Sequence, residues 1–178
     1  MNVQSILESI QGSALAAWMR DTNPAMQVVE STHVLAAVLV LGTVLIADLR
    51  LLGLTDPQRA FSRIGRETLP LTWTAFGVAV VTGSLMFTTS AHTYFGNTAF
   101  QLKAIALLAA GLNMLLFQLL TARGIGAWDS GRPPRTARIA GVVSLLLWAA
   151  VVLLGRWIGF TKGYDFTIPP GVELVLPG

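Results

Sequence analysis

The stretch Val34-Leu-Ala-Ala-Val-Leu-Val-Leu-Gly-Thr-Val-Leu-Ile-Ala47 decides the fold of this chain, because it carries no charge and is apolar on every side of a helix. A helix that is apolar all round has to be buried in protein or in lipid. The flanking residues, among which Glu30 is the one charged residue, extend the expected helix back to Ala25. At 1.5 Å per residue a helix over 25–47 is about 34 Å long. That length is sufficient to cross the hydrocarbon core of a bilayer, which is about 30 Å thick.

Three further apolar runs of similar length follow, over about 69–89, 98–120 and 139–160. The only charged residues inside them are Lys103 and Arg156. The whole chain has 178 residues, of which 12% are charged, whereas soluble domains carry roughly a quarter. Its mean hydropathy is +0.64. We therefore predict an all-α fold, an integral membrane four-helix bundle, as a single membrane domain over 1–178.

Short segments are expected on either side of the four spans. Apolar residues recur at helical spacing over about 5–19, which predicts a short amphipathic helix in the membrane interface. Ser5 and Glu8 have the spacing of a capping box at its start. The segment 161–178 is rich in proline and is predicted to be an extracytoplasmic tail.

The distribution of basic residues predicts the orientation of the bundle. Two of the loops that connect the spans hold most of the Lys and Arg residues, while the loop over 90–97 has none. These basic residues are Arg50, Arg59, Arg63, Arg66, Arg123, Arg132, Arg135 and Arg138. The positive-inside rule places both basic loops in the cytoplasm, so both termini are expected in the periplasm.

The composition also excludes several classes of protein. The chain has no Cys, so a disulfide, a thiolate nucleophile and an iron–sulfur cluster are excluded. The basic residues flank the spans and form no separate stripe or tail, so we expect a lipid bilayer and no nucleic acid as a partner. No glycine-rich phosphate loop or Ser-His-Asp pattern indicates an independent hydrolase or transferase, and whether the protein is an enzyme stays open.

Five ionisable residues are expected in the outer half of the bundle. Glu30 and His33 are three residues apart and share one face of the first span. His92 follows the outer end of the second span, while Lys103 and Arg156 lie about one turn inside the third and fourth. Ionisable groups in lipid are costly and generally face partners or a cavity, so this cluster is the candidate functional site.

The cluster has a structural interpretation and three functional ones. In the structural interpretation Glu30 pairs with Lys103 or Arg156, a backbone or hydroxyl group satisfies His33, and His92 is exposed. In the first functional interpretation a haem b is bound, with His33 and His92 as axial ligands. Lys103 and Arg156 would then pair with the haem propionates.

The second functional interpretation is a metal site. Glu30, His33 and His92 would supply one carboxylate and two imidazoles, a ligand set that suits zinc, copper or iron. The third is translocation of protons or a solute, with the Glu30–His33 pair, Asn113 and Gln118 as parts of a path.

Four sequence motifs carry a resemblance to a known family. They are Asp48-Leu-Arg-Leu-Leu-Gly53, Leu69-Pro-Leu-Thr-Trp73, Thr82-Gly83 and Gly155-Arg-Trp-Ile-Gly159. In these motifs the chain resembles an uncharacterised bacterial family of four-helix inner-membrane proteins. The resemblance implies a bacterial inner-membrane location and a four-helix architecture, with no assigned activity.

A looser likeness, to four-helix membrane b-type cytochromes and copper-resistance membrane domains, rests on the helix count and the outer-half histidines. The leading specific prediction, argued from His33 and His92, is electron transfer by haem b, with a redox partner. The alternative is a structural or accessory subunit beside other membrane subunits.

Overall fold

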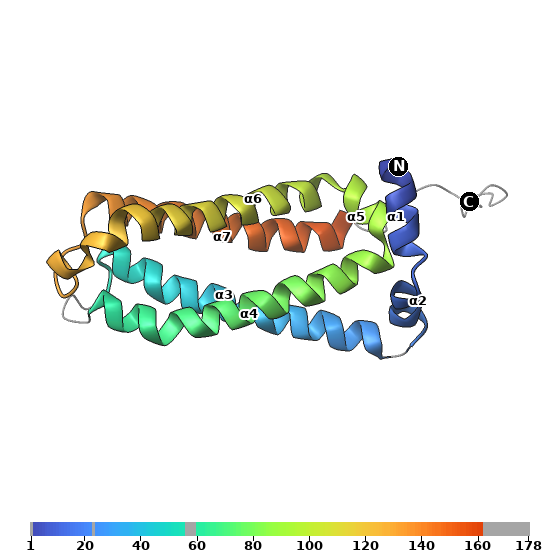
Figure 1. Cartoon of the computed structure of the whole chain (residues 1–178), viewed down its shortest axis with the longest axis horizontal. Helices are drawn as coiled ribbons and strands as arrows, with labels where there is room; N and C mark the ends of the chain where they lie inside the picture. Colours follow the sequence, from blue (N-terminus) through green and yellow to red (C-terminus); the bar gives the residue numbers. More distant parts are fainter. Residues whose placement is uncertain (1, 23, 56–59, 162–178) are drawn as a thin grey trace, which may run out of the picture.

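The structure, a computed structural model, describes residues 2–22, 24–55 and 60–161. Within these ranges all regular elements are helical and there is no strand (Figure 1). The helices are α1 (Val3–Gln11), α2 (Ala14–Asp21), α3 (Ala25–Leu52), α4 (Phe61–Thr89), α5 (Ala91–Gly96), α6 (Thr98–Leu116), the π-helical η1 (Phe117–Thr121), the 3-10 helical η2 (Ala122–Ala127) and α7 (Arg135–Thr161). Helices α3, α4, α6 with η1, and α7 are long and apolar enough to cross a membrane. The four predicted spans and the all-α fold class are confirmed.

The first span extends further than the sequence predicts. Helix α3 continues past Ala47 to Leu52 and ends at Gly53, whose φ of 75° is the left-handed conformation typical of a residue that follows a helix. The predicted helix over 25–47 is therefore too short at its C-terminal end. Asp48 and Arg50 lie inside the helix, and both are buried.

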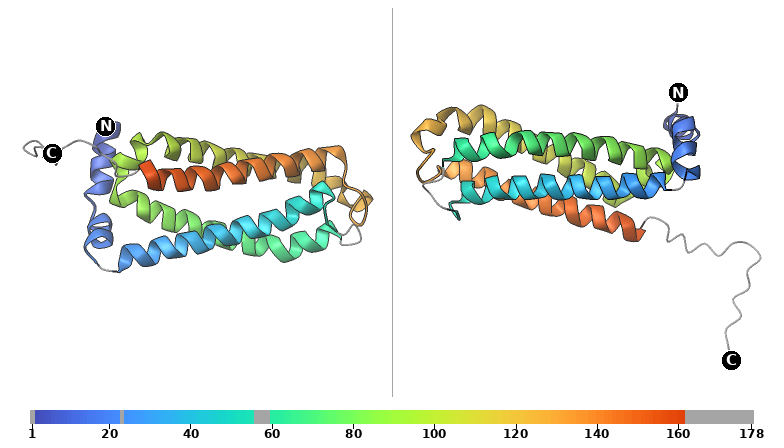
Figure 2. Two further views of the ribbon diagram at one scale, coloured as in Figure 1. Left: turned by 180° about the vertical axis from the view of Figure 1, so that it is seen from behind. Right: turned by 90° about the horizontal axis from the view of Figure 1, so that it is seen from below.

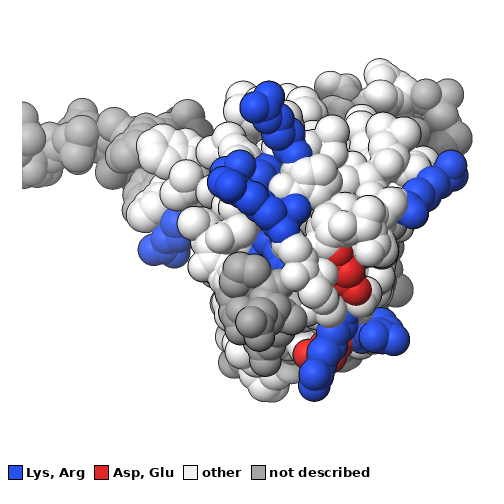
Figure 3. All heavy atoms as spheres, turned by 90° about the vertical axis from the view of Figure 1, so that its left-hand side faces the viewer, with Lys and Arg blue, Asp and Glu red and all other residues white. Residues whose placement is uncertain are grey.

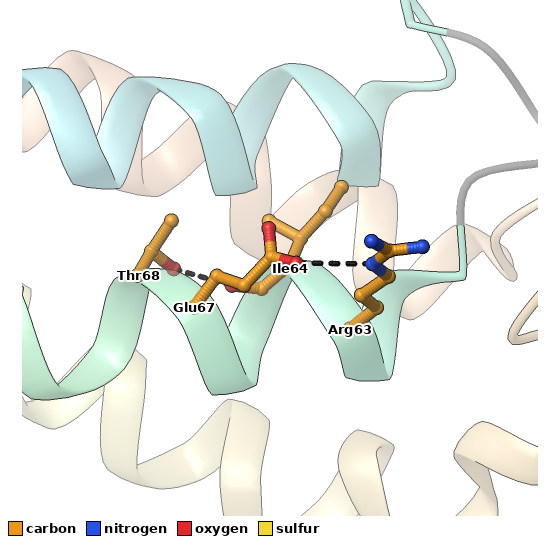
Figure 4. Close-up of polar contacts among 4 residues, drawn as sticks. All are labelled: Arg63, Ile64, Glu67 and Thr68. Carbon is orange, nitrogen blue, oxygen red and sulfur yellow. Dashed lines mark hydrogen bonds and ion pairs between the residues drawn. The ribbon is translucent and has the colours of Figure 1, made fainter.

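The second span begins earlier than predicted, at Phe61 instead of Leu69. One face of its first turns is polar and exposed, while Phe61 and Ile64 are buried. On the exposed face Arg63 and Glu67 form an ion pair of 3.0 Å one turn apart (Figure 4). Hydropathy finds only the part of a helix that lies in the hydrocarbon, whereas the backbone hydrogen bonds continue into the headgroup layer. The boundaries that hydropathy predicts are therefore too short at this end.

The four long helices form two hairpins, α3 with α4 and α6 with α7 (Figures 1 and 2). Packing between α3 and α7 joins the two hairpins. Gly141 permits this close approach, because a Cβ atom there would lie 3.1 Å from Cβ of Leu51. Within the described residues the backbones of α4 and α6 rarely come close, and the two helices meet where the ring of Phe87 stacks on that of Phe100, with centroids 5.6 Å apart. The bundle is thus packed more closely along the other three of its four sides.

The two ends of the bundle differ in character. We call the end that holds residues 49–55, 60–66 and 121–138 the arginine end, and the opposite end the α1 end. Buried apolar residues close each of them. They are Leu51, Phe61 and Ala137 at the arginine end, and Tyr94, Ala99 and Ile158 at the α1 end.

The amino-terminal region lies across the α1 end as two short helices (Figure 1). The prediction of one helix over 5–19 is wrong, because the chain turns at Gly12 and the Ser13 side chain then caps α2 by accepting a hydrogen bond from the backbone N–H of Ala16. The capping box is not formed either. The first helix begins at Val3, and the Ser5 hydroxyl donates to the carbonyl of Asn2.

Both short helices pack on the bundle. Leu7 of α1 is buried, as are Ala16 and Met19 of α2. Of the predicted tail over 161–178, only Thr161 lies within the described residues, as the last residue of α7. Arg59 also lies outside them.

Candidate functional site

His33 lies at the interface between α3 and α4. Its Nδ1 atom is 3.0 Å from the carbonyl oxygen of Ala79 and 3.0 Å from the hydroxyl oxygen of Thr82. The ring fits because residue 83 is a glycine, where a Cβ atom would come within 3.1 Å of Cε1 of His33. The imidazole of His33 on α3 therefore packs directly against α4.

These contacts assign the tautomer of His33. The carbonyl of Ala79 can only accept a hydrogen bond, and the Thr82 hydroxyl already donates its hydrogen to the carbonyl of Val78, at 2.7 Å. Nδ1 must therefore carry the hydrogen and donate to both oxygens. Within the described residues Nε2 makes no hydrogen bond. In the neutral ring it is the nitrogen with the available lone pair.

Lys103 reaches the same half of the bundle from the second hairpin. It is half-buried on α6, and its side chain runs over Gly155 of α7, where a Cβ atom would lie 3.3 Å from Nζ. Within the described residues no ion pair joins Lys103 to Glu30.

The ion pairs expected in the structural interpretation do not form. Glu30 is exposed, and the only salt bridge among residues 2–22, 24–55 and 60–161 is the one between Arg63 and Glu67. Arg156 is exposed as well, and its guanidinium carbon lies 4.7 Å from the centre of the Phe160 ring, a cation–π contact. The expected hydrogen bonding of His33 by a backbone and a hydroxyl group is, by contrast, present.

His92 lies in a different place from His33. It is exposed on α5, where its backbone N–H donates to the Gln11 side chain at 3.3 Å. It lines a surface pocket of about 290 Å³ together with Glu8 and Arg20. The Thr82 partner of His33 lies seven residues before the end of α4, about 10 Å along the helix, and His92 follows that end.

Two imidazoles at such different depths do not bind the same metal ion, because each metal–nitrogen bond is about 2 Å long. In the described part of the chain no three His, Asp or Glu residues gather as metal ligands. The structure therefore does not bring Glu30, His33 and His92 together.

A cavity at this end lies elsewhere. It measures about 450 Å³ and opens between α6 and α7, with Leu102, Leu154 and Trp157 in its wall. It is lined by none of the five residues of the predicted cluster.

A second polar centre, which the sequence interpretation missed, lies at the arginine end. Arg50 is completely buried, and its Nη2 atom donates to the carbonyls of Asp129 (3.0 Å) and Gly131 (3.1 Å). The Asp129 carboxylate accepts hydrogen bonds from the backbone N–H and the hydroxyl of Ser62, both 2.7 Å long. These hydrogen bonds, that of the hydroxyl first, hold the pKa of Asp129 below its usual value of 3.8.

Asp48 belongs to the same half of the bundle. Its carboxylate is buried at the interface between α3 and α7, with Ser144 as its hydrogen-bond partner. Its Oδ2 atom makes no hydrogen bond within the described residues. The signal that could have revealed this centre is Gly53, because a glycine after an apolar helix marks its end and so places Asp48 and Arg50 inside.

The architecture and the buried polar groups define a class: the protein is an integral membrane protein with several membrane-spanning helices. More specifically, the chain belongs to DUF6644, a family of unknown function, whose family model matches residues 22–161. The resemblance drawn from the sequence motifs is confirmed at this level. No curated protein and no solved structure matches the chain. The looser likeness to b-type cytochromes and copper-resistance domains is not shown by these comparisons.

Proposed function

We propose that this protein is a haem b protein that transfers electrons in the bacterial inner membrane, with His33 as the single protein ligand to the iron. The observation that supports this best is the hydrogen bonding of Nδ1. Metal-ligating histidines usually donate their second ring N–H to a carbonyl or carboxylate, which fixes the tautomer and the orientation of the ring. Ala79 and Thr82 provide such acceptors and leave Nε2 available. Haem iron would supply one-electron chemistry.

Lys103 supports the proposal by its charge and position. A half-buried ammonium group needs a counter-charge, and within the described residues Lys103 forms no ion pair. A haem propionate would provide one. Arg156 remains a second candidate for a propionate, although its guanidinium group lies against Phe160. His92 has no part in this proposal, because it lies at the surface beyond the end of α4.

The proposed orientation places the arginine end in the cytoplasm and His33 in the periplasmic half of the bilayer. The basis is the positive-inside rule, since the exposed arginines of the loops gather at one end of the bundle. Cysteines introduced at Ser130 and at Thr93, which are both exposed, test it. A thiol reagent that does not cross the membrane should label Thr93→Cys from the periplasm and Ser130→Cys only after the membrane is opened. The reverse labelling would contradict the orientation.

The haem itself is tested by the absorption spectrum of the protein purified in a mild detergent after expression with a haem precursor. We expect a Soret band in the wild type and in His92→Ala, and its loss or a strong reduction in His33→Ala. His92→Ala is the matched control, because it removes an exposed imidazole. Equal helix content of the two variants in circular dichroism separates loss of haem from unfolding. A colourless wild type, or full haem content in His33→Ala, would falsify the proposal.

The second candidate, an accessory subunit of a membrane complex, is favoured by the open side of the bundle. Apart from the stacking of Phe87 on Phe100, helices α4 and α6 lie apart, and they carry exposed apolar residues such as Val81 (61% exposed) and Leu108 (76%). Lipid or another subunit must cover these residues. A polar substitution at Leu108 should reduce the size of the species seen in native electrophoresis of solubilised membranes if a subunit covers it. An unchanged size would indicate lipid.

A further inference from the structure

Exposed arginines crowd the segment that leads into α7. Arg132 precedes the helix, Arg135 is its first residue, and Arg138 follows one turn later. All three side chains are exposed, and at this end of the molecule the space-filling view shows more basic than acidic surface (Figure 3). We call these three residues the arginine cluster.

No carboxylate of the described chain neutralises the arginine cluster. Glu67, on α4, is paired with Arg63, and Asp129 is engaged by Ser62. The first turn of α7 contains no acidic residue. The N-terminal end of a helix carries a partial positive charge of its own, which adds to that of the arginines. This end of α7 therefore attracts an anion from outside the chain.

The segment that carries the cluster is anchored to the bundle. The fully buried Arg50 donates to the carbonyls of Asp129 and Gly131, and Gly131 directly precedes the cluster. Pro133, between the first two arginines, is buried. The backbone that presents the cluster is thus held in place, so less conformational freedom is lost when the arginines bind a partner.

The length of α7 places the cluster in the headgroup layer of the bilayer. The helix has 27 residues and is about 40 Å long at 1.5 Å per residue. The hydrocarbon core accounts for about 30 Å of a bilayer that measures about 40–45 Å with its headgroups. Because the apolar part of α7 begins at Ile139, directly after Arg138, the cluster lies at the depth of the lipid phosphates.

We propose that the arginine cluster is a binding site for anionic phospholipids. A guanidinium group binds a phosphate through two parallel hydrogen bonds, and several of them close together favour lipids with a net negative charge. The site depends neither on the haem proposal nor on which side of the membrane the arginine end faces.

The test uses the full-length protein in neutral detergent with either phosphatidylglycerol or phosphatidylcholine, and native mass spectrometry to count the lipids that remain bound. We expect the wild type to retain phosphatidylglycerol in preference. The variant R132Q/R135Q/R138Q should lose that preference. Its affinity for phosphatidylglycerol should fall about fivefold for each arginine removed. The variant R63Q/R66Q/R123Q removes the same net charge outside the cluster. It should keep most of the preference for phosphatidylglycerol.

Two results would overturn the proposal. An equal loss in both triple variants would mean that diffuse charge, and not this cluster, attracts the lipid. A wild type that shows no preference between the lipids but binds polyglutamate through the cluster would identify an acidic protein as the partner. A third variant, R132K/R135K/R138K, tests the geometry, because lysine keeps the charge and loses the bidentate contact, so it should bind phosphatidylglycerol more weakly than the wild type.

Discussion

Asp129 caps a helix whose first turn lies 67 residues earlier in the chain: its carboxylate accepts hydrogen bonds from both the backbone N–H and the hydroxyl of Ser62. Capping side chains usually come from the residue just before the helix. Here Ala60 stands at that position, and its side chain offers no hydrogen-bonding group. The cap therefore connects α4 to the segment before α7 as well as satisfying the first turn of the helix.

Replacing Asp129 by Ala should lower the free energy of unfolding by about 0.5 to 2 kcal/mol, the usual range for a lost helix cap. The reason is that the N–H and the hydroxyl of Ser62 lose their acceptor. Unfolding in mixed detergent micelles, followed by circular dichroism, measures the change. Ser130→Ala, an exposed neighbour, is the control and should change the value by less than about 0.5 kcal/mol. Equal stability of the two variants would mean that the cap is not needed.

The Asp129 cap should also depend on pH. Since the pKa of Asp129 in the folded protein lies below 3.8, its contribution to stability is complete above that value and is lost as the pH falls through the lower, folded-state pKa. The difference in stability between the wild type and Asp129→Asn should therefore decrease from about pH 5 to pH 2. A difference that stays constant over this range would show that the carboxylate charge plays no part.

Gly83 and Gly77 offer a matched pair of substitutions on α4. A Cβ atom at Gly83 would lie 3.1 Å from the His33 ring, while one at Gly77 would meet nothing within 4 Å. Gly83→Ala should displace the ring from its hydrogen-bond partners on α4 and destabilise the bundle by about 1 kcal/mol or more. Gly77→Ala should be neutral or stabilising by up to about 1 kcal/mol, because alanine favours a helix.

The nitrogen-15 NMR signals of the His33 ring give a second measurement for this pair. The Nδ1 signal should shift in Gly83→Ala and stay in place in Gly77→Ala. An unchanged ring signal in Gly83→Ala would mean that the close contact at residue 83 does not position the histidine.

Arg50 should tolerate no substitution, lysine included. Its hydrogen bonds to two carbonyls connect α3 to the segment 129–131, and bonds to a charged group contribute about 1.5 to 3 kcal/mol each. Lysine cannot reproduce the fork of donors, so Arg50→Lys should lose a large part of this stability, and Arg50→Met most of it. Arg66→Met, at an exposed position, is the control. If Arg50→Lys were as stable as the wild type, the fork geometry would be irrelevant.

Glu30 and Lys103 should behave as independent residues. They form no ion pair in the structure, so the effects of Glu30→Gln and Lys103→Met on stability should add to within about 0.5 kcal/mol in the double variant. Chemical unfolding of all four proteins of the cycle measures this. If the double variant were substantially more stable than the sum of the two single effects, the Glu30–Lys103 ion pair that the sequence predicts would be supported.

The parts of the structure that sequence predicts well are those set by lipid as the solvent. Four apolar runs have to cross the bilayer as helices, because in lipid the hydrogen bonds within each helix satisfy the backbone groups that water cannot reach. The polar environment of His33 follows from its depth in the first span, but its partners do not. Ala79 and Thr82 depend on how α3 and α4 pair, and no local pattern encodes that pairing.

The charge pattern does not predict the polar centre at the arginine end, for a related reason. An arginine near the end of a span usually reaches water, and the positive-inside rule treats it as a marker of orientation. Arg50 is buried because the distant segment 129–131 folds back over it. Burial of this kind depends on tertiary structure, so the charge pattern of a single helix does not reveal it.

The packing of α3 against α7 at Gly141 has a consequence for how the protein is made. Each hairpin has its own long contact between neighbouring helices, so each can be inserted into the bilayer as a unit before the two meet. A bulky residue at position 141 would therefore act after insertion. It would leave two correctly inserted hairpins in the membrane that cannot pack against each other. Measurements of membrane insertion alone would not detect this defect of assembly.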